Sequence, residues 1–339
     1  MKTSRQIYCQ YLLSSQINYT CTNLADHTDG LDHNSVYRYL KGEHLRPALI
    51  WEKVKDLIVQ TPEGYLLFDD TVLDKSYSFE IDGVRRQYSG NAHGVVKGIG
   101  IVNLVYYNAE RDQYWIIDYR LFDPERDGKT KLDHLNDMLD SVQRRGIRFR
   151  TVLMDAWYAT TQIMTRLIKE AKIFYCPLKK NRLVDESKGA RPYQSVESLE
   201  WTAADEQMGK TIKVKGFAQD TYLKLFRVVV SPDRTDYIVT NDMTQSDTDA
   251  AQQESGHQES GHRWKIEQFH REEKQLTGIG DCECRINRSQ RNHLCCAMLT
   301  WVCLKNLAYQ TGQTVYQLKH GLLSDYLRQQ LRCPTIAFS

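Results

Sequence analysis

Apolar runs and amphipathic stretches follow one another through the middle of the chain. Short apolar runs predict five strands, at 64–73, 94–107, 114–124, 150–155 and 173–178. Apolar residues repeat every three or four positions at about 131–145 and 160–171, which predicts two helices. Three hairpin-linked strands followed by alternating helix and strand predict an α/β fold, in which helices flank a mixed sheet.

The regions on either side have a different character. Residues 1–57 read as a small helical domain, and residues 181–250 as a β-rich insertion. The predicted organisation has five parts: 1–57 (helical), 58–180 (first part of the α/β domain), 181–250 (insertion), 251–312 (remainder of the α/β domain) and 313–339 (C-terminal helical tail). Trp201 in the insertion is either a stacking platform for a base or a core residue, and the core reading is favoured.

The amino-terminal region resembles a helix-turn-helix. Leu24 and Ala25 precede Gly30, and Ser35 to Leu40 would form the second helix. In that reading Tyr37 and Arg38 face DNA, although the spacing from alanine to glycine is one residue longer than usual. A plain helical bundle is the alternative.

Residues 263–274 place a carboxylate between cations. Steps of four, four and three put Arg263, Glu267, Arg271 and Lys274 on one side of a helix. Such a side suits a site that holds a divalent metal while gripping a polyanion. The alternative is a solvated helix with intrahelical ion pairs.

Two predicted strands end in aspartate, which is unusual because Asp is depleted from strands. Asp70 follows one apolar run and Asp155 follows another. Each could instead cap the following helix, but a metal site shared with Glu267 accounts for all three acids at once. Asp69 is the alternative first acid, because adjacent residues on a strand face opposite sides and only one can enter the site.

These motifs resemble those of bacterial insertion-sequence transposases with a DDE triad. Arg263-x3-Glu267-x6-Lys274 matches the R-x3-E-x6-K part of the family's Y-R-E-K signature, and the strand ends at Asp70 and Asp155 match its two aspartates. The resemblance covers roughly residues 60–310. The signature tyrosine is replaced by Ser260, beside a tandem repeat of Gln-Glu-Ser-Gly-His at 253–262.

The resemblance implies a ribonuclease-H-like catalytic domain interrupted by a β insertion. It implies a DNA transposase that cuts double-stranded DNA at element ends and joins 3′-hydroxyls to target DNA, acting as a homodimer. Asp70, Asp155 and Glu267 would hold two Mg²⁺ ions, for which Mn²⁺ can substitute. Arg263, Arg271 and Lys274 would contact DNA. The alternatives are a metal-dependent nuclease without strand transfer and a non-catalytic DNA-binding descendant.

Composition adds limits to this picture. The chain has 339 residues, enough for two or three domains, and a net charge of only +2. Basic residues nevertheless gather near the proposed site, with 12 Lys and Arg against 4 Asp and Glu in residues 144–191, and 11 against 6 in residues 263–332. The chain has no signal peptide and no apolar run of the ~20 residues that cross a bilayer, so we expect a cytoplasmic, nucleoid-associated protein with no membrane contact.

The nine cysteines read as reduced thiols. Cys282 and Cys284, with His293, Cys295 and Cys296 nearby, match no standard zinc spacing. The last two cysteines lie in a strongly apolar run, which favours buried thiols over zinc ligands.

Overall fold

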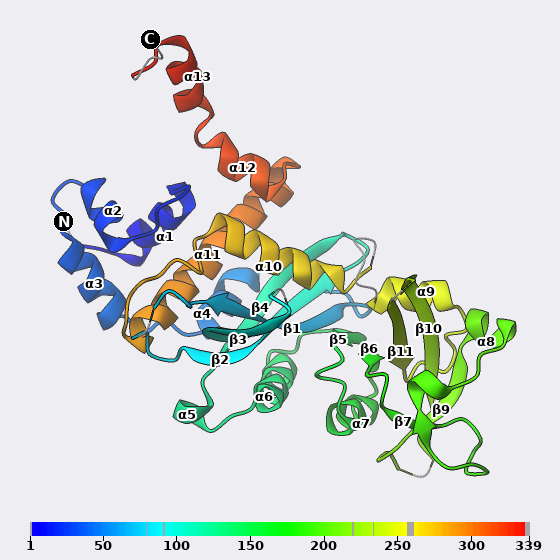
Figure 1. The fold of residues 1–339 in the computed structure, drawn as a ribbon. Helices are drawn as coiled ribbons and strands as arrows, with labels where there is room; N and C mark the ends of the chain where they lie inside the picture. Colours follow the sequence, from blue (N-terminus) through cyan, green and yellow to red (C-terminus); the bar gives the residue numbers. More distant parts are fainter. Residues whose placement is uncertain are drawn as a thin grey trace.

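One mixed sheet runs through the molecule, with helices on both faces (Figure 1). The computed structural model describes residues 2–78, 80–90, 92–218, 220–232, 234–255 and 261–335, and for Gln253 and Ser255 it describes only the backbone. Ser260 and the rest of residues 256–260, half of the tandem repeat, lie outside the described residues.

Five strands form the part of the sheet that we call the core sheet, in the order β4-β3-β1-β5-β6. The strands are β1 (Tyr65–Asp74), β3 (Gly94–Asn108), β4 (Gln113–Phe122), β5 (Thr151–Met154) and β6 (Ile173–Leu178). β1, β3 and β4 are antiparallel neighbours, whereas β5 and β6 run parallel to β1. This order is the predicted ribonuclease-H-like arrangement. The short strand β2 (Arg85–Ser89), which also pairs with β3, was not predicted.

Helices cover the core sheet on opposite faces (Figure 1). One face carries α6 (Lys131–Arg144), after the short α5 (Pro124–Asp127), and α7 (Thr161–Lys169). The other face carries α10 (Trp264–Leu276) and the 25-residue α11 (Asn287–Thr311). The expected cap of α7 is present, since the Thr160 hydroxyl accepts a hydrogen bond from the Ile163 backbone N–H.

The β-rich insertion extends the core sheet instead of forming a separate one. Its strand β11 pairs antiparallel with β6, and the order continues β11-β10-β9-β7-β8. The elements are β7 (Leu183–Asp185), β8 (Gln194–Ser195), the 3-10 turn Val196–Ser198, α8 (Ala203–Met208), β9 (Lys210–Val214), β10 (Leu223–Ser231), β11 (Arg234–Thr240) and α9 (Thr248–Ser255). Trp201 packs against the hydrophobic core, which supports its structural reading.

The amino-terminal helices are α1 (Arg5–Ser14), α2 (Cys21–Asp26), α3 (His33–Gly42) and α4 (Ala48–Val54). Their apolar side chains belong to the same hydrophobic cluster as those of α11. The Tyr8 hydroxyl lies 2.8 Å from His293 Nδ1, and the Asn292 side chain donates to the Leu40 carbonyl at 2.7 Å. Residues 1–57 therefore share their core with the rest of the chain.

A buried polar network joins α10 to α11. The Glu272 carboxylate, 1% exposed, accepts hydrogen bonds from Tyr114 Oη and Trp301 Nε1, each at 2.9 Å. Lys305 Nζ lies 3.2 Å from both carboxylate oxygens of Glu272. Because the partners come from β4 and α11, the network fixes α10 against the rest of the fold.

The carboxy-terminal helix α12 (Val315–Gly321) packs on α10 and α11, and α13 (Ser324–Arg332) projects beyond it (Figure 1). Leu327 and Leu331 of α13 are 57% and 77% exposed, and Leu323 just before the helix is 43% exposed, so this amphipathic helix has an uncovered apolar side. Among the described helices, none combines the length and the apolar character needed to span a membrane. Cys295 and Cys296 are buried free thiols, as predicted.

Glu273, the neighbour of Glu272, gives a testable pH dependence. It is 1% exposed, and neither carboxyl oxygen has a hydrogen-bond partner among the described residues. Burial raises the pKa of Glu273 from 4.5 to about 8. Because its pKa is higher in the folded state, the unfolding free energy should fall as pH rises from 4.5 to 8. Glu273→Gln should abolish this fall in the unfolding free energy, which is on the order of 5 kcal/mol at about 1.36 kcal/mol per pKa unit.

Urea unfolding at several pH values between 5 and about 9 would measure the effect. The two proteins should differ little near pH 5, and the variant should be the more stable one above pH 8. Parallel pH profiles for Glu273→Gln and the parent would contradict a neutral buried carboxyl group.

Candidate active site

The site begins where the parallel pairing of β1 with β5 ends, because β5 stops at Met154 whereas β1 continues to Asp74. Phe68 of β1 is the register partner of Met154 of β5, and Asp69 and Asp155 are the residues that follow them. Partners in neighbouring strands project to the same face of a sheet. Asp155 is among the charges that act on the Asp69 carboxyl group. The topology thus brings together two acids that are separated by 85 residues of sequence.

Asp69 and Asp70 point in opposite directions. Asp69 faces α10, where its Oδ2 lies 3.5 Å from Arg263 Nη1. Asp70 faces α6 and α7 instead, since its carboxylate bonds to Lys131 Nζ at 2.5 Å and to the Tyr158 hydroxyl at 2.9 Å. The geometry therefore groups Glu267 with Asp69, the alternative first acid, and places the expected Asp70 against α6.

The third acid, Glu267, stands in the first turn of α10. Its Oε1 lies 3.3 Å from Arg263 Nη2, so Arg263 contacts both Asp69 and Glu267. Arg263 was expected to contact DNA, yet its side chain is only 1% exposed. A guanidinium buried between two carboxylates orients them and offsets their repulsion. In this structure Arg263 is thus a positioning residue for the acids.

His270 is a member of the site that the sequence interpretation missed. Ligand atoms of Asp69, Glu267 and His270 all lie within 4.8 Å of one another. His270 Nε2 also lies 2.9 Å from Asn103 Nδ2, and Asn103 is the register partner of Asp69 on β3. The available signal was spacing, because His270 follows Glu267 by three residues and so shares its side of the helix.

Burial and like charge dominate the electrostatics. The pKa of Asp69 is raised well above its usual range, first by burial and then by Glu267, while Arg263 acts in the opposite direction. Burial lowers the pKa of His270 to about 4, which leaves its imidazole neutral at pH 7. Burial also lowers the pKa of Lys274, although Glu273, Glu267 and Asp69 oppose this shift. Lys274 thus lies close enough to Glu267 and Asp69 to interact with them electrostatically.

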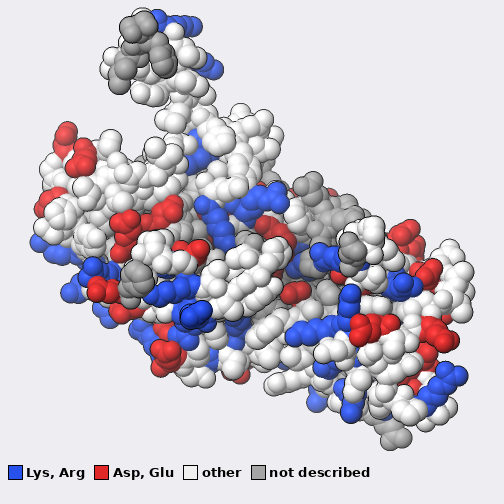
Figure 2. Space-filling model, viewed as in Figure 1, with Lys and Arg blue, Asp and Glu red and all other residues white. Residues whose placement is uncertain are grey.

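A cavity of about 800 Å³ opens over these residues. Its walls include Asp155 and Glu267, which the sequence predicted as metal ligands, and Asp69, which was the alternative first acid. Lys131, Lys179 and Arg234 line the same cavity, and Asp70 is also part of its wall. Figure 2 shows that Lys and Arg side chains lie along the middle of the molecular face that it draws, interspersed with Asp and Glu side chains. Cations around an acidic centre suit an anionic substrate.

The donor set fits a divalent cation. Carboxylate oxygens are the ligands that hard cations prefer, and three acids reach this cavity from β1, β5 and α10. Burial and then the Glu267 carboxylate raise the pKa of Asp69, and a bound cation would favour the charged form of this group. Zinc-type cysteine ligation finds no support, because within the described residues the only potential metal-binding group is Asp69, Glu267 and His270.

The other predicted DNA contacts lie on the surface. Arg271 is exposed on α10, and its guanidinium lies 5.1 Å from the centre of the Trp264 ring. Arg38 and Tyr37 lie on the exposed side of α3, with side-chain exposure of 72% for Arg38 and residue exposure of 44% for Tyr37. Gly30, at φ +69°, turns the chain between α2 and α3, as the helix-turn-helix reading requires.

Fold and site together define a ribonuclease-H-like domain with a cluster of carboxylates at one cavity. Two family models match the chain, a "Transposase DDE domain" over residues 104–303 and a "DDE superfamily endonuclease" over residues 1–184. Each match spans more than half of the 339 residues. The chain belongs to the DDE transposase family.

Comparison with individual proteins gives more distant matches. A piggyBac transposase in a synaptic complex with hairpin DNA, solved by cryo-electron microscopy, is 15% identical. That alignment covers 98% of this chain and 72% of the other, with a TM-score of 0.44. No curated protein sequence matches this chain.

Proposed function

We propose that the chain is the DNA transposase of an insertion sequence, which cuts at the element ends and joins the freed 3′-hydroxyls to target DNA. The observation that carries the proposal is the meeting of Asp69, Asp155 and Glu267 at one cavity. Asp69 lies in the middle of β1, Asp155 directly follows β5, and Glu267 lies on α10, so the acids occur in the order of the family's motifs. Family membership gives the class of enzyme, and the geometry supports the choice of these residues.

Asp69, Asp155 and Glu267 would hold two Mg²⁺ ions, for which Mn²⁺ can substitute. Bound metal would activate the attacking oxygen and stabilise the leaving oxygen of an in-line displacement. Arg263 would keep the Asp69 and Glu267 carboxylates in place. Neutral His270, held by Asn103, would complete this side of the site without adding charge.

The DNA would lie across the basic rim of the cavity. Lys274 and Arg271 extend the site along α10 and would contact phosphates there, Lys as a point charge and Arg as a fork. Arg38 and Tyr37 on α3 would recognise the element's own ends. A homodimer would pair two ends, and the uncovered apolar side of α13 is available for that contact.

A metal-dependent nuclease on the same fold is the second candidate, since it would need the same acids. Incubation of the protein with precut end DNA bearing a free 3′-hydroxyl, supercoiled target plasmid and MgCl₂ separates the two. A transposase should convert the plasmid into joined product, because a 3′-hydroxyl and water are interchangeable nucleophiles in this displacement.

Two matched controls make the assay decisive. End DNA carrying a 3′-deoxy terminus should bind equally well and give no joined product. Asp155→Asn should also bind and give none, since the loss of one carboxylate removes charge stabilisation but leaves the phosphate contacts. Nicked plasmid without any joined DNA, formed by the parent protein, would favour the nuclease.

A further inference from the structure

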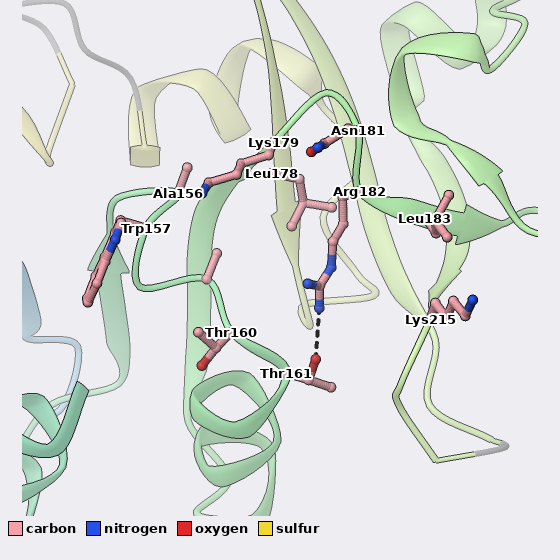
Figure 3. A pocket seen from close by; sticks show the side chains of 11 residues that line it. Ala156, Trp157, Thr160, Thr161, Leu178, Lys179, Asn181, Arg182, Leu183 and Lys215 are labelled. Carbon is pink, nitrogen blue, oxygen red and sulfur yellow. Dashed lines mark hydrogen bonds between the residues drawn. The ribbon is translucent and has the colours of Figure 1, made fainter. Parts of the chain in front are cut away.

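A second cavity, of about 440 Å³, adjoins the one that holds the acids. Both cavities are lined by Ala156, Trp157 and Lys179. Its other walls come from the start of α7 and from the segment that leads from β6 into β7, with Lys215 at the far side (Figure 3). The two cavities therefore form one continuous path that starts at Asp155.

The second cavity has the opposite charge character. Its cations are Lys179, Arg182 and Lys215, and its described lining contains no acidic residue. Over the described parts of the chain, none of these three side chains forms an ion pair. Three cations without carboxylate partners favour an anionic ligand, and phosphate oxygens are acceptors suited to both Lys and Arg.

Arg182 is held at the wall of the second cavity by a hydrogen bond. Its Nη2 donates to the Thr161 hydroxyl at 2.8 Å (Figure 3), which holds the guanidinium at the start of α7. Its Nε is buried and has no hydrogen-bond partner among the described residues. Because this Nε is inaccessible, a ligand oxygen in the second cavity would contact the terminal N–H groups of Arg182 instead.

Trp157 stands where the two cavities meet. It is 44% exposed although its neighbour Tyr158 is fully buried, and their rings meet edge-on, with centroids 5.0 Å apart. Lys131 Nζ lies 5.6 Å from the centre of the Trp157 ring. In Figure 3, Lys179 extends from the end of β6 toward Ala156 and Trp157. An exposed indole among cations suits stacking against a nucleobase whose phosphate is held nearby.

We infer that this second cavity binds one unpaired nucleotide of the DNA strand that passes the acids. Its base would lie against Trp157, and its phosphates would contact Lys179, Arg182 and Lys215. The volume is in the range of small-ligand pockets, ~300–1,000 Å³, and cannot admit a duplex. The inference rests on the proposed function, because the continuity with Asp155 is what makes DNA the source of the nucleotide.

The test compares two end duplexes, one blunt and one with a short single-stranded extension, in binding assays at fixed salt. For the parent protein the extension should strengthen binding. Trp157→Ala should remove about 5- to 100-fold of affinity for the extended DNA, the range expected from loss of one stacked base. Trp157→Phe should retain most of that affinity. The double change Arg182→Ala and Lys215→Ala should also weaken binding of the extended DNA more than of the blunt DNA.

Matched changes in the insertion serve as controls. Tyr193 is 37% exposed and Lys188 is also exposed, yet neither lines the cavity. Tyr193→Ala and Lys188→Ala should leave the preference for extended DNA unchanged. A free deoxynucleoside monophosphate should compete weakly, and strong competition would identify a free nucleotide as the ligand and overturn the inference.

Abasic sites in the extension allow a test with the unaltered protein. A single abasic position should lower its affinity by a factor similar to that of Trp157→Ala, and should have no further effect on that variant. Equal affinity for intact and abasic extensions would overturn the inference. If the same preparation then forms joined product, the proposed transposase function stands although the nucleotide site does not. If it forms no joined product but prefers extended DNA in a Trp157-dependent way, the nucleotide site stands and the transposase function is refuted.

Discussion

Replacing Asp69 by Asn is expected to lower DNA cleavage by on the order of 10²–10³-fold or more while end binding persists. Asp69 shares the α10 side of the sheet with Glu267, so its loss would remove a metal-ligating oxygen. Asp70→Asn should lower cleavage far less, because Asp70 is held by Lys131 and Tyr158 on the other side. Single-turnover cleavage of labelled end DNA in MgCl₂ measures both variants.

Each variant is the natural control for the other, since the two changes are chemically identical and one residue apart. Binding by both proteins must be shown with the same end DNA, so that a loss of cleavage is not a loss of affinity. The assignment of Asp69 would be refuted by an active Asp69→Asn protein beside an inactive Asp70→Asn protein.

Removal of the Glu272 carboxylate is expected to have the largest effect on stability. Glu272→Ala would leave Lys305 buried, 6% exposed, without its charge partner, and would remove the acceptor of Tyr114 and Trp301. The loss of one partner of a buried ion pair costs about 3–5 kcal/mol. Urea unfolding monitored by tryptophan fluorescence would measure it.

The double variant Glu272→Met, Lys305→Met separates charge from packing. Both charges then disappear together, so the double variant should be more stable than Glu272→Ala. If the loss of unfolding free energy in the double variant equals the sum of the losses in Glu272→Met and Lys305→Met, the two side chains do not act as a pair. Because α10 also carries Glu267, Glu272→Ala should lower cleavage at temperatures well below its unfolding midpoint as well.

Periodicity was sufficient to predict the core sheet. β6 has the predicted bounds, and β3 and α6 differ from the predicted segments by one residue. These segments carry long apolar runs or a clear amphipathic stripe, whose burial is decided locally. The short strand β2, Arg-Arg-Gln-Tyr-Ser, has no apolar run and is held by its pairing with β3 and by the Arg85–Asp123 ion pair, so no local pattern marked it.

The sequence predicted the type of site, a cluster of acids, but not the role of every residue in it. Sequence spacing identified Asp155 and Glu267 as candidate acids, but the choice between Asp69 and Asp70 depended on which face of β1 meets α10. That orientation is a tertiary property, because both faces of β1 are covered by helices. For the same reason the sequence assigned Arg263 to DNA, whereas burial places it between Asp69 and Glu267.

The packing of the amino-terminal helices on α11 limits how the proposed recognition of element ends could be re-engineered. Arg38 and Tyr37 are exposed on α3, while Val36 and Leu40 of the same helix are fully buried in the shared core. Asn292 of α11 further ties down the carbonyls of Leu40 and Glu43. Grafting residues 1–57 from a relative would therefore replace the buried side chains that pack on α11 as well as the exposed side chains of α3. Altered specificity is better sought by exchanging individual exposed side chains of α3 than by exchanging the whole segment.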